Sequence, residues 1–417
     1  MSSHLPRREF IIRAATAGCL GAATGFLGSA DREAVAADSK PSSLKITKVE
    51  TFALQHKLPR GIGPSTGEYG FRETLLVKIT TDSGLVGWGE TADVGGTHGI
   101  IEEHLKPGLL GKNALDHRQL WQQLWGPNFG DGRAVAGVDM ALHDVRGKAL
   151  NQSVAEMYGG RVRDKVLAYA AAMNYVTGIR PEDQHPDEAK ELVARGFRAM
   201  KIRTGRYGHK RDLGVLTKIR ENVGSDIRLL TDGNGAFTVP TAVKFGKELE
   251  KLDFYFFEEP LPQASNYAGY VELTHSLDIA IAGGEVLDSR GAARDLIVQR
   301  AFDVIQPDVS LCGGIAEVLF IAEMARLFSI QCIPHCWAGS ITLAATMQVL
   351  ALLPPYTLGL HSDEAMLEHD TYENPFRDEL VTKPFKLDKD GFIAVPTTPG
   401  LGIEVNEEVV KKYLMKS

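Results

Sequence analysis

The feature of this sequence that most constrains its fold is a regular spacing of short apolar runs, each ending in a polar residue. From residue 203 to residue 335 these polar ends recur at intervals of 23 to 29 residues. Such an interval accommodates one strand, one helix and two loops, and the segments between the runs have helix-compatible patterns. The spacing therefore predicts a parallel β/α barrel. The polar ends are, in chain order, Lys201 with Arg203, Asp232, Glu258, Glu285, Asp308 and His335.

The chain before the barrel has a different pattern. Apolar and polar residues alternate over residues 44–50 and 74–80, and the turn sequence Asp-Ser-Gly at 82–84 leads into a third run at 85–90. This alternation predicts an antiparallel sheet. The segment 58–71, which is rich in Gly and Pro, is interpreted as a loop between the first two strands.

These patterns divide the chain into domains. Helical periodicity is clearest at residues 135–150, so we expect an α+β capping domain over residues 44–165 and an α/β barrel over residues 166–383. The tail from residue 384 to residue 417 loses the barrel spacing but contains an expected strand at 391–395. We expect this tail to return to the capping domain.

Residues 1–36 predict an export signal rather than part of the fold. Arg7 and Arg8 precede an uncharged run over residues 14–30, and Ala34-Val35-Ala36 supplies a small-residue cleavage pattern. This resembles a twin-arginine signal, so we expect the twin-arginine export machinery as a partner, a periplasmic mature protein and no stable membrane association after cleavage. A lipid-modified Cys19 and an N-terminus with arginines that occur by chance are the alternatives.

Charge and cysteine content narrow the classes of function. A net charge of −7 argues against a nucleic-acid partner, which would require a basic surface. Cys332 and Cys336 flank His335 in a manner that raises the possibility of zinc. However, residues 331–335 have the pattern of a short buried strand, and no second Cys/His pair has structural-zinc spacing. We therefore interpret the cysteines as core thiols.

Three neighbouring predicted strand ends carry carboxylates that suit a metal site. Asp232, Glu258 and Glu285 end adjacent strands, and side chains at the carboxyl ends of barrel strands point into one shared mouth. Like charges that converge in a cleft repel one another unless a proton or a cation intervenes. Hard oxygen ligands suit Mg²⁺, so these residues are predicted metal ligands. Carboxylates that cap neighbouring helices are the alternative interpretation.

The next two strand ends predict a hydrogen-bonded pair. Asp308 and His335 follow successive strands, so a bond from carboxylate to imidazole is expected. Such a bond fixes the tautomer of the ring and raises the basicity of its other nitrogen. His335 is therefore a candidate general base.

A set of short motifs gives the sequence a specific resemblance. The motifs are Lys201-Ile202-Arg203, Thr231-Asp232-Gly233-Asn234, Phe257-Glu258-Glu259-Pro260, Gly283-Gly284-Glu285, Gln306-Pro307-Asp308, Gly313-Gly314, Pro334-His335 and residues 141–148. In this order along the chain, they resemble the mandelate racemase and muconate lactonizing branch of the enolase superfamily over nearly all of residues 44–417. The resemblance implies a modified (β/α)7β barrel with an α+β capping domain, Mg²⁺ bound by the three carboxylates, and a homo-oligomer.

The resemblance also implies a chemistry. Sites of this kind remove a proton from the carbon next to a carboxylate and stabilise the resulting enediolate with a metal and cationic side chains. The implied substrate is a small carboxylic acid. Glu368 would donate a hydrogen bond to the enediolate oxygen, which requires a protonated carboxyl group, and Glu364 and Glu373 compete for this role.

The reaction that we expect within this family depends on how many side chains can accept a proton and on which face of the substrate they lie. Residues 303–308 contain no lysine base, and Arg203 stands where a second base often lies, although a guanidinium is a poor proton acceptor. A racemase needs a base on each face of the carbanion, whereas a dehydratase needs only His335. We therefore predict Mg²⁺-dependent dehydration of an aldonate or aldarate, with Lys201 and Arg203 at its carboxylate. A racemase or epimerase that uses Lys201 on the other face, and a non-catalytic binding protein, are the alternatives.

Substrate contacts are expected from capping-domain loops over the barrel mouth and from Asn234 in the second-strand motif. Arg60, Tyr69 and His98 are the candidates from the segments 59–69 and 93–98. Polar side chains in these loops suit a polyol, because buried hydroxyl groups need hydrogen-bond partners. The same loops could equally be ordinary solvated connections.

Overall fold

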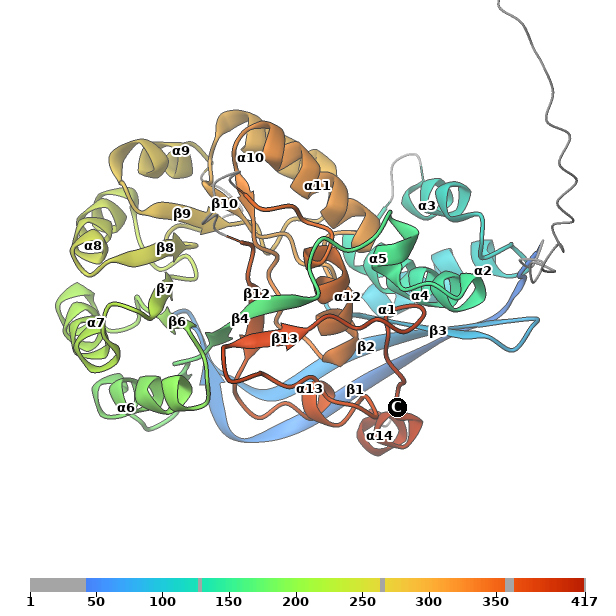
Figure 1. The fold of residues 1–417 in the computed structure, drawn as a ribbon, viewed down its shortest axis with the longest axis horizontal. Helices are drawn as coiled ribbons and strands as arrows, with labels where there is room; N and C mark the ends of the chain where they lie inside the picture. The colour runs from blue at the N-terminus through green and yellow to red at the C-terminus, as the bar shows by residue number, and fades with distance from the viewer. Residues whose placement is uncertain (1–42, 127–129, 263–266, 357–363, 416–417) are drawn as a thin grey trace, which may run out of the picture. The chain divides into compact units, whose positions relative to one another are not determined.

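The computed structural model describes residues 43–126, 130–262, 267–356 and 364–415 (Figure 1). Its first sheet is antiparallel and has the strand order β3-β2-β1-β5. The members are β1 (Ile46–Gly63), β2 (Tyr69–Thr81), β3 (Val86–Thr91) and β5 (Tyr175–Val176).

The predicted loop over residues 58–71 is wrong in extent. Strand β1 continues to Gly63 and β2 begins at Tyr69, so only residues 64–68 connect them. Ile62 pairs with Tyr69 on one side and with Val176 of β5 on the other. Backbone pairing on both sides therefore keeps this Gly- and Pro-containing segment extended.

The capping domain also contains several helices. They are α1 (Thr97–Gly99), a π-helix η1 (Ile100–Leu105), α2 (Lys106–Leu109), α3 (His117–Trp125), α4 (Gly132–Leu150) and α5 (Val154–Met157). Of these, α4 packs most closely against the sheet, on β2 and β3. Asp131 caps α4 by accepting a hydrogen bond from the backbone N–H of Ala134. Helix α4 packs so tightly on β3 that a Cβ on Gly89 would lie 1.9 Å from the carbonyl oxygen of Gly137. Glycine is therefore required at this contact.

The second sheet contains the parallel strands of the barrel, in the order β11-β10-β9-β8-β7-β6-β4-β12. Because β12 lies beside β4, the last of these strands returns to the first, as a (β/α)7β barrel requires. The strands are β4 (Lys165–Ala171), β6 (Ala199–Arg203), β7 (Arg228–Asp232), β8 (Phe254–Glu258), β9 (Ala280–Gly283), β10 (Val304–Ile305), β11 (Gln331–Cys332) and β12 (Leu367–Asp370).

The connecting helices follow the predicted pattern, and Figure 1 shows α6 to α11 on the outside of the curved sheet. Helix α12 differs because it is buried along its whole length and packs against both α11 and β3 of the capping domain. The helices are α6 (Pro181–Ala194), α7 (His209–Val223), α8 (Val239–Lys251), α9 (Tyr267–Ser276), α10 (Arg290–Gln299), α11 (Ile315–Leu327) and α12 (Ser340–Leu350).

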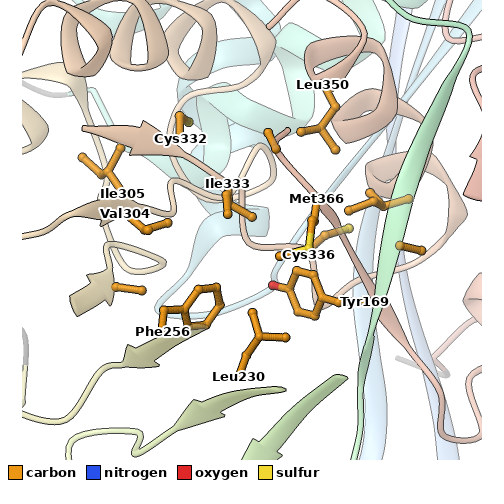
Figure 2. Packing of buried hydrophobic residues seen from close by; sticks show 14 of the residues in the cluster. Tyr169, Leu230, Phe256, Val304, Ile305, Cys332, Ile333, Cys336, Leu350 and Met366 are labelled. Atoms are coloured by element: carbon orange, nitrogen blue, oxygen red, sulfur yellow. The ribbon is translucent and has the colours of Figure 1, made fainter. Parts of the chain in front are cut away.

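The barrel interior is a packed apolar core. Figure 2 shows Tyr169, Leu230, Phe256 and Ile333 directed toward one another from different strands and loops. The rings of Tyr169 and Phe256 meet edge to face with centroids 6.5 Å apart. The three cysteines of the described residues, Cys312, Cys332 and Cys336, are buried free thiols. This core holds the strands that carry the polar ends.

The C-terminal segment contacts both domains. Helix α13 (Pro375–Asp378) follows β12, and β13 (Phe392–Ala394) then pairs antiparallel with β4 of the barrel. Helix α14 (Glu407–Tyr413) leads to Leu414, which forms a bridge with Leu54 of β1. In the part of the chain that the structure describes, we find no helix with the length and apolar character needed to cross a membrane.

Candidate active site

Three of the predicted site residues end consecutive barrel strands. Arg203, Asp232 and Glu258 are the last residues of β6, β7 and β8. The parallel register places Arg203 beside Asp232 and Asp232 beside Glu258. Their side chains therefore emerge at the same end of the barrel.

The other three polar ends lie just beyond their strands. Glu285 follows the end of β9, Asp308 follows β10, and His335 follows β11. The strands are shorter than the apolar runs suggest, so loops rather than strands hold these side chains. They nevertheless contact the same cluster. His335 Nε2 lies 3.3 Å from Glu285 Oε2 and 3.9 Å from Glu368 Oε2. Glu368 Oε1 in turn lies 2.7 Å from Lys201 Nζ.

Lys201 is the centre of the ion pairs in this cluster. Its Nζ lies 2.7 Å from Glu258 Oε1, 2.7 Å from Glu368 Oε1 and 3.7 Å from Asp232 Oδ2, and its side chain is fully buried. Burial alone would lower the pKa of Lys201, but these carboxylates outweigh it and raise the pKa above its ordinary value. Lys201 is therefore held as an ammonium ion.

Arg203 and Asn234 contact the same aspartate. Arg203 Nη1 forms an ion pair with Asp232 Oδ2 and donates to Asn234 Oδ1 at 3.3 Å. The backbone N–H of Asn234 donates to Asp232 Oδ1 at 2.8 Å. Asn234 thus orients Asp232 and the guanidinium of Arg203.

His335 and Asp308 form the expected pair. His335 Nδ1 lies 2.6 Å from Asp308 Oδ2, while Asp308 Oδ1 accepts from the backbone N–H and from the hydroxyl of Ser310, each at 2.6 Å. The second ring nitrogen, Nε2, faces Glu285 and lies 3.9 Å from Glu368 Oε2. The pair therefore directs one nitrogen of His335 toward the carboxylates.

Burial and charge shift the pKa values of these acids in opposite directions. Burial raises the pKa of Glu258 to about 7 against the charge of Lys201, with Asp232 and Glu368 adding to the rise. Burial by itself would raise the pKa of Glu368 as well, but Lys201 and His335 outweigh it and lower this pKa to about 2. For His335, burial favours the neutral ring, yet Glu285, Glu368 and Asp308 raise its pKa to about 10. Crowded carboxylates thus dominate the site.

Comparison with known proteins identifies the family. Residues 48–159 match the family described as "Mandelate racemase / muconate lactonizing enzyme, N-terminal domain", and residues 184–409 match "Enolase C-terminal domain-like". The chain belongs to the mandelate racemase/muconate lactonizing enzyme family of the enolase superfamily.

Relatives of this chain include named sugar-acid enzymes. The D-galactarolactone cycloisomerase of Agrobacterium fabrum is 31% identical over 378 residues, which are 89% of this chain and 99% of that protein. The D-galactonate dehydratase of Verminephrobacter eiseniae is 34% identical over 81% of this chain and 90% of its own length. The crystal structure of the 3,6-anhydro-D-galactonate cycloisomerase from Zobellia galactanivorans has a TM-score of 0.79 at 32% identity and covers 89% of this chain and all of that one.

The carboxylates of this family member suit a divalent cation by their chemistry. Burial raises the pKa values of Glu258 and Glu285, and nearby Asp232 adds to both rises, so a cation between them would relieve their repulsion. In the structure, Lys201 and Arg203 provide that positive charge. The ligand atoms of Asp232, Glu258 and Glu285 do not all lie within 4.8 Å of one another in this structure. Within the described ranges, ligand atoms that are this close together occur at His117, Asp139 and His143 of the capping domain.

Glu368 lies in the cluster, and its competitors do not. Both are exposed, and Glu364 pairs with Arg163 while Glu373 pairs with His56. Glu368 Oε2 accepts from the backbone N–H of Cys336 at 3.2 Å. With its pKa lowered to about 2, Glu368 is a carboxylate in this structure and so accepts hydrogen bonds. Donation to an enediolate oxygen would require a higher pKa for Glu368, and this role stays a prediction.

The predicted substrate contacts have different outcomes. The hydroxyl of Tyr69 is buried, and the Arg72 guanidinium lies over its ring at 5.8 Å. Arg60 is exposed and lines a cavity with Tyr372. His98 is exposed, and its backbone N–H donates to Asp93. The structure shows no contact from Arg60 or His98 to the clustered acids.

Sequence reasoning missed two residues near the mouth. Gln306 Nε2 donates to Glu258 Oε2 at 3.0 Å. Arg72 is buried, pairs with Asp370 at 2.7 Å and lies 4.8 Å from the ring of Trp337, which also faces Arg203. The position of Gln306 two residues before Asp308 was a usable signal. Arg72, in contrast, lies on a capping strand whose alternation does not predict this contact.

The connection between β1 and β2 is fastened to the barrel. Ser65 Oγ donates to the carbonyl oxygen of Gly233 at 2.7 Å, and Arg206 pairs with Glu68 and donates to the carbonyl oxygen of Gly67. The capping domain thus reaches the loop that follows Asp232. A substrate in the barrel mouth would meet residues from both domains.

Proposed function

We propose that this chain catalyses Mg²⁺-dependent dehydration of a sugar acid, an aldonate or aldarate, to a 2-keto-3-deoxy acid. The observation that carries the proposal is the asymmetry of the proton-handling groups. His335 presents one ring nitrogen to the acid cluster, whereas Lys201 is enclosed by three carboxylates. One available base supports elimination better than racemisation, which needs a base on each face. Relatives named as dehydratases of sugar acids add support.

In this proposal His335 handles both protons. Its Nε2, when the ring is neutral, takes the proton from the carbon next to the substrate carboxylate, and Asp308 at Nδ1 stabilises the imidazolium that forms. Positive charge held among the carboxylates would offset the effect of Glu285 and Glu368, which raise the pKa of His335, and would so favour the neutral ring. The electron pair of the broken C–H bond moves toward the carboxylate to form the enediolate. It then returns and expels the hydroxyl group from the β-carbon, the next carbon of the substrate. The imidazolium returns its proton to that oxygen, so water leaves and the remaining enol becomes the 2-keto acid.

The cationic side chains would offset the charge that develops on the carboxylate. Arg203 offers a planar guanidinium that suits a carboxylate, and Lys201 is a fully buried ammonium beside it. Asp232, Glu258 and Glu285 would hold Mg²⁺, which, when bound, supplies additional positive charge for the substrate carboxylate.

A second candidate is ring opening of a cyclic sugar acid. The relatives named as cycloisomerases of D-galactarolactone and 3,6-anhydro-D-galactonate favour it. Proton removal by His335 would be the same, but the oxygen expelled from the adjacent carbon would be part of a ring. The product would then keep the mass of the substrate.

A screen of acid sugars separates these reactions. The full chain with Mg²⁺ is incubated in D₂O with aldonates, aldarates and their lactones, and 2-keto acids are detected with semicarbazide. Dehydration gives a 2-keto acid lighter than the substrate by one water. Ring opening gives an isomer, and epimerisation returns substrate labelled at the α-carbon. Label exchange without elimination for every acid would overturn the proposed dehydration.

We also propose that residues 1–36, which lie outside the described residues, direct export by the twin-arginine route to the periplasm. The paired arginines and the uncharged run support this. In a bacterium with that pathway, replacing both Arg7 and Arg8 by Lys should retain the full-length chain in the cytoplasm. Equal periplasmic amounts of wild type and variant would contradict the proposal.

A further inference from the structure

A cavity of about 560 Å³ lies away from the acid cluster, where the capping domain meets the barrel helices. Its walls come from α3, α4 and the end of α5 on one side and from α10 and α11 on the other. This volume is within the range of small-molecule sites in proteins. Its lining includes His117, Arg118, Arg146, Tyr158, Arg290 and Phe320.

The side chains that line this cavity carry a net positive charge. Three of them are arginines, and one, Asp116, is acidic. Arg118 and Arg290 lie over the same indole ring, that of Trp121, at 5.8 and 4.5 Å from its centroid. The charge of Arg290 is compensated by Glu317 at 2.6 Å, but no ion pair of Arg118 occurs within the described ranges.

Arg146 is the least compensated of the three. Its Nε is buried and has no hydrogen-bond partner, and no ion pair joins its guanidinium to any residue that the structure describes. Burial lowers the pKa of Arg146, and the nearby Tyr158 and Asp139 offset this effect only in part. A guanidinium in this situation offers paired N–H donors to an oxyanion.

The adjacent histidine cluster does not make the cavity a metal site. His143 uses both ring nitrogens, one at 2.8 Å from the carbonyl oxygen of Asp139 and the other at 2.8 Å from the Tyr158 hydroxyl. His117 Nε2 is engaged by Asp139 Oδ1 at 2.9 Å. A metal would have to break these bonds and would lie close to Arg146, so an anion is electrostatically favoured over a cation.

We propose that this cavity is a second ligand site, which binds a small oxyanion, a carboxylate or a phosphate, through Arg146 and Arg118. Tyr158 and Phe320, both partly exposed, provide an aromatic rim for the rest of the ligand. Because the walls belong to both domains, an occupant would connect them and raise the free energy of unfolding.

Calorimetric titration of the Mg²⁺-loaded full chain tests this site. The probes are inorganic phosphate and succinate, titrated separately at ionic strength held constant with NaCl. Each arm tests one source of the oxyanion, and a saturable site for either supports the proposal. Arg146→Gln should weaken that binding about tenfold or more, because a charge-assisted hydrogen bond is lost, and Arg118→Gln should weaken it less.

Arg294→Gln is the matched control. Arg294 lies on α10 like Arg290, but it is exposed and paired with Asp295, so its loss should leave the affinity within about twofold, as surface charges at a distance contribute little. Retained thermal unfolding and retained turnover in Arg146→Gln would show that the variant folds. Arg118→Gln, at an exposed position, keeps the test valid if Arg146→Gln does not fold.

Three results would overturn the proposal. The first is the absence of saturable binding of both anions to the wild type. The second is unchanged binding in both arginine variants. The third is stoichiometric binding of Zn²⁺, supplied as the only probe, that His117→Asn abolishes, because it would make the histidine cluster a metal site.

Discussion

Two buried histidines of this molecule each pair with an aspartate, but the charges around the two pairs are opposite. His335 and His117 are 8% and 7% exposed, and each bonds to an aspartate, Asp308 at 2.6 Å and Asp139 at 2.9 Å. Burial favours the neutral ring in both. At His335 the carboxylates of Glu285 and Glu368 reverse this and raise the pKa to about 10. At His117, the neighbouring His143 adds to burial, and the pKa is lowered.

The difference shows that an aspartate partner does not by itself define a catalytic histidine. The surrounding charges decide which species each site favours. Clustered acids around His335 favour a cation, and uncompensated arginines near His117 favour an anion. A His–Asp pair is therefore informative only together with the groups that face the second nitrogen of the ring.

The largest effect should come from replacing the histidine at the acid cluster. His335→Asn removes the proton acceptor while keeping a similar polar volume. We expect turnover of the sugar acid identified by screening to fall by at least about a thousandfold, within the range for loss of a general base. Steady-state kinetics with Mg²⁺ would measure it, and thermal unfolding would verify the fold.

His117→Asn is the matched control for that loss. It also breaks a His–Asp pair, but this pair faces the arginine-lined cavity. Turnover should stay within about threefold of wild type, because His117 contacts Asp139 and His143 rather than the acid cluster and so should not change transition-state stabilisation there. Equal losses in the two variants would erase the distinction between the pairs.

The acid cluster could be predicted from the sequence because barrel geometry converts spacing into proximity. Apolar runs of one repeat length place their ends at one rim, so Arg203, Asp232 and Glu258 are strand ends in the structure. The apolar pattern predicts strand ends less accurately where the strands are short. Glu285, Asp308 and His335 lie on loops, and the apolar pattern alone does not reveal where the backbone pairing stops.

The second cavity could not be predicted in this way. Arg118, Arg146 and Arg290 come from three helices in two domains, and no repeat relates their positions. The loop predicted at residues 58–71 failed for a related reason. Pairing of Ile62 on both sides is a tertiary effect that Gly and Pro content does not report.

The cation preference of the acid cluster can be tested through Glu258. Glu258→Gln removes a predicted ligand and one partner of Lys201. We expect the Mg²⁺ concentration for half-maximal activity to rise about a hundredfold or more, since even residues behind metal ligands change affinity by tenfold or more. Activity would be titrated with Mg²⁺ after dialysis against EDTA.

Glu259→Gln provides the comparison for this variant. Glu259 is the next residue and is also buried, but it follows the end of β8. Its replacement should change the Mg²⁺ requirement much less. A larger change for Glu259→Gln than for Glu258→Gln would assign the ligand to Glu259 instead.

A smaller effect should follow when His335 keeps its ring but loses its partner's charge. Asp308→Asn retains an oxygen for the bonds from Ser310 but no longer stabilises the imidazolium. We expect kcat to fall about 10- to 100-fold with little change in KM. Ser310→Ala, which removes only one bond to Asp308, should be milder, and a reversed order would contradict the orienting role of the carboxylate.

The smallest effect concerns stability at the other pair. The pKa of His117 lies below its ordinary value of 6.5, chiefly because of burial, with His143 and Arg146 opposing the proton and Asp139 favouring it. As pH falls below 6.5, the unfolded chain therefore gains a proton that the native chain resists, and the free energy of unfolding decreases. His117→Gln should reduce this decrease between pH 7 and pH 5, measured by urea unfolding. Asp139 contributes little to the difference, because its pKa is lowered from 3.8 and the Gln side chain can still donate a hydrogen bond to it. The buried histidines away from this pair, His185 and His335, are common to both proteins and cancel. The difference therefore reports His117 together with His143, whose ring centroid lies 4.4 Å from its own. A steeper loss of stability in the variant would mean that protonated His117 is stabilised in the native protein, and the contrast with His335 would then be wrong.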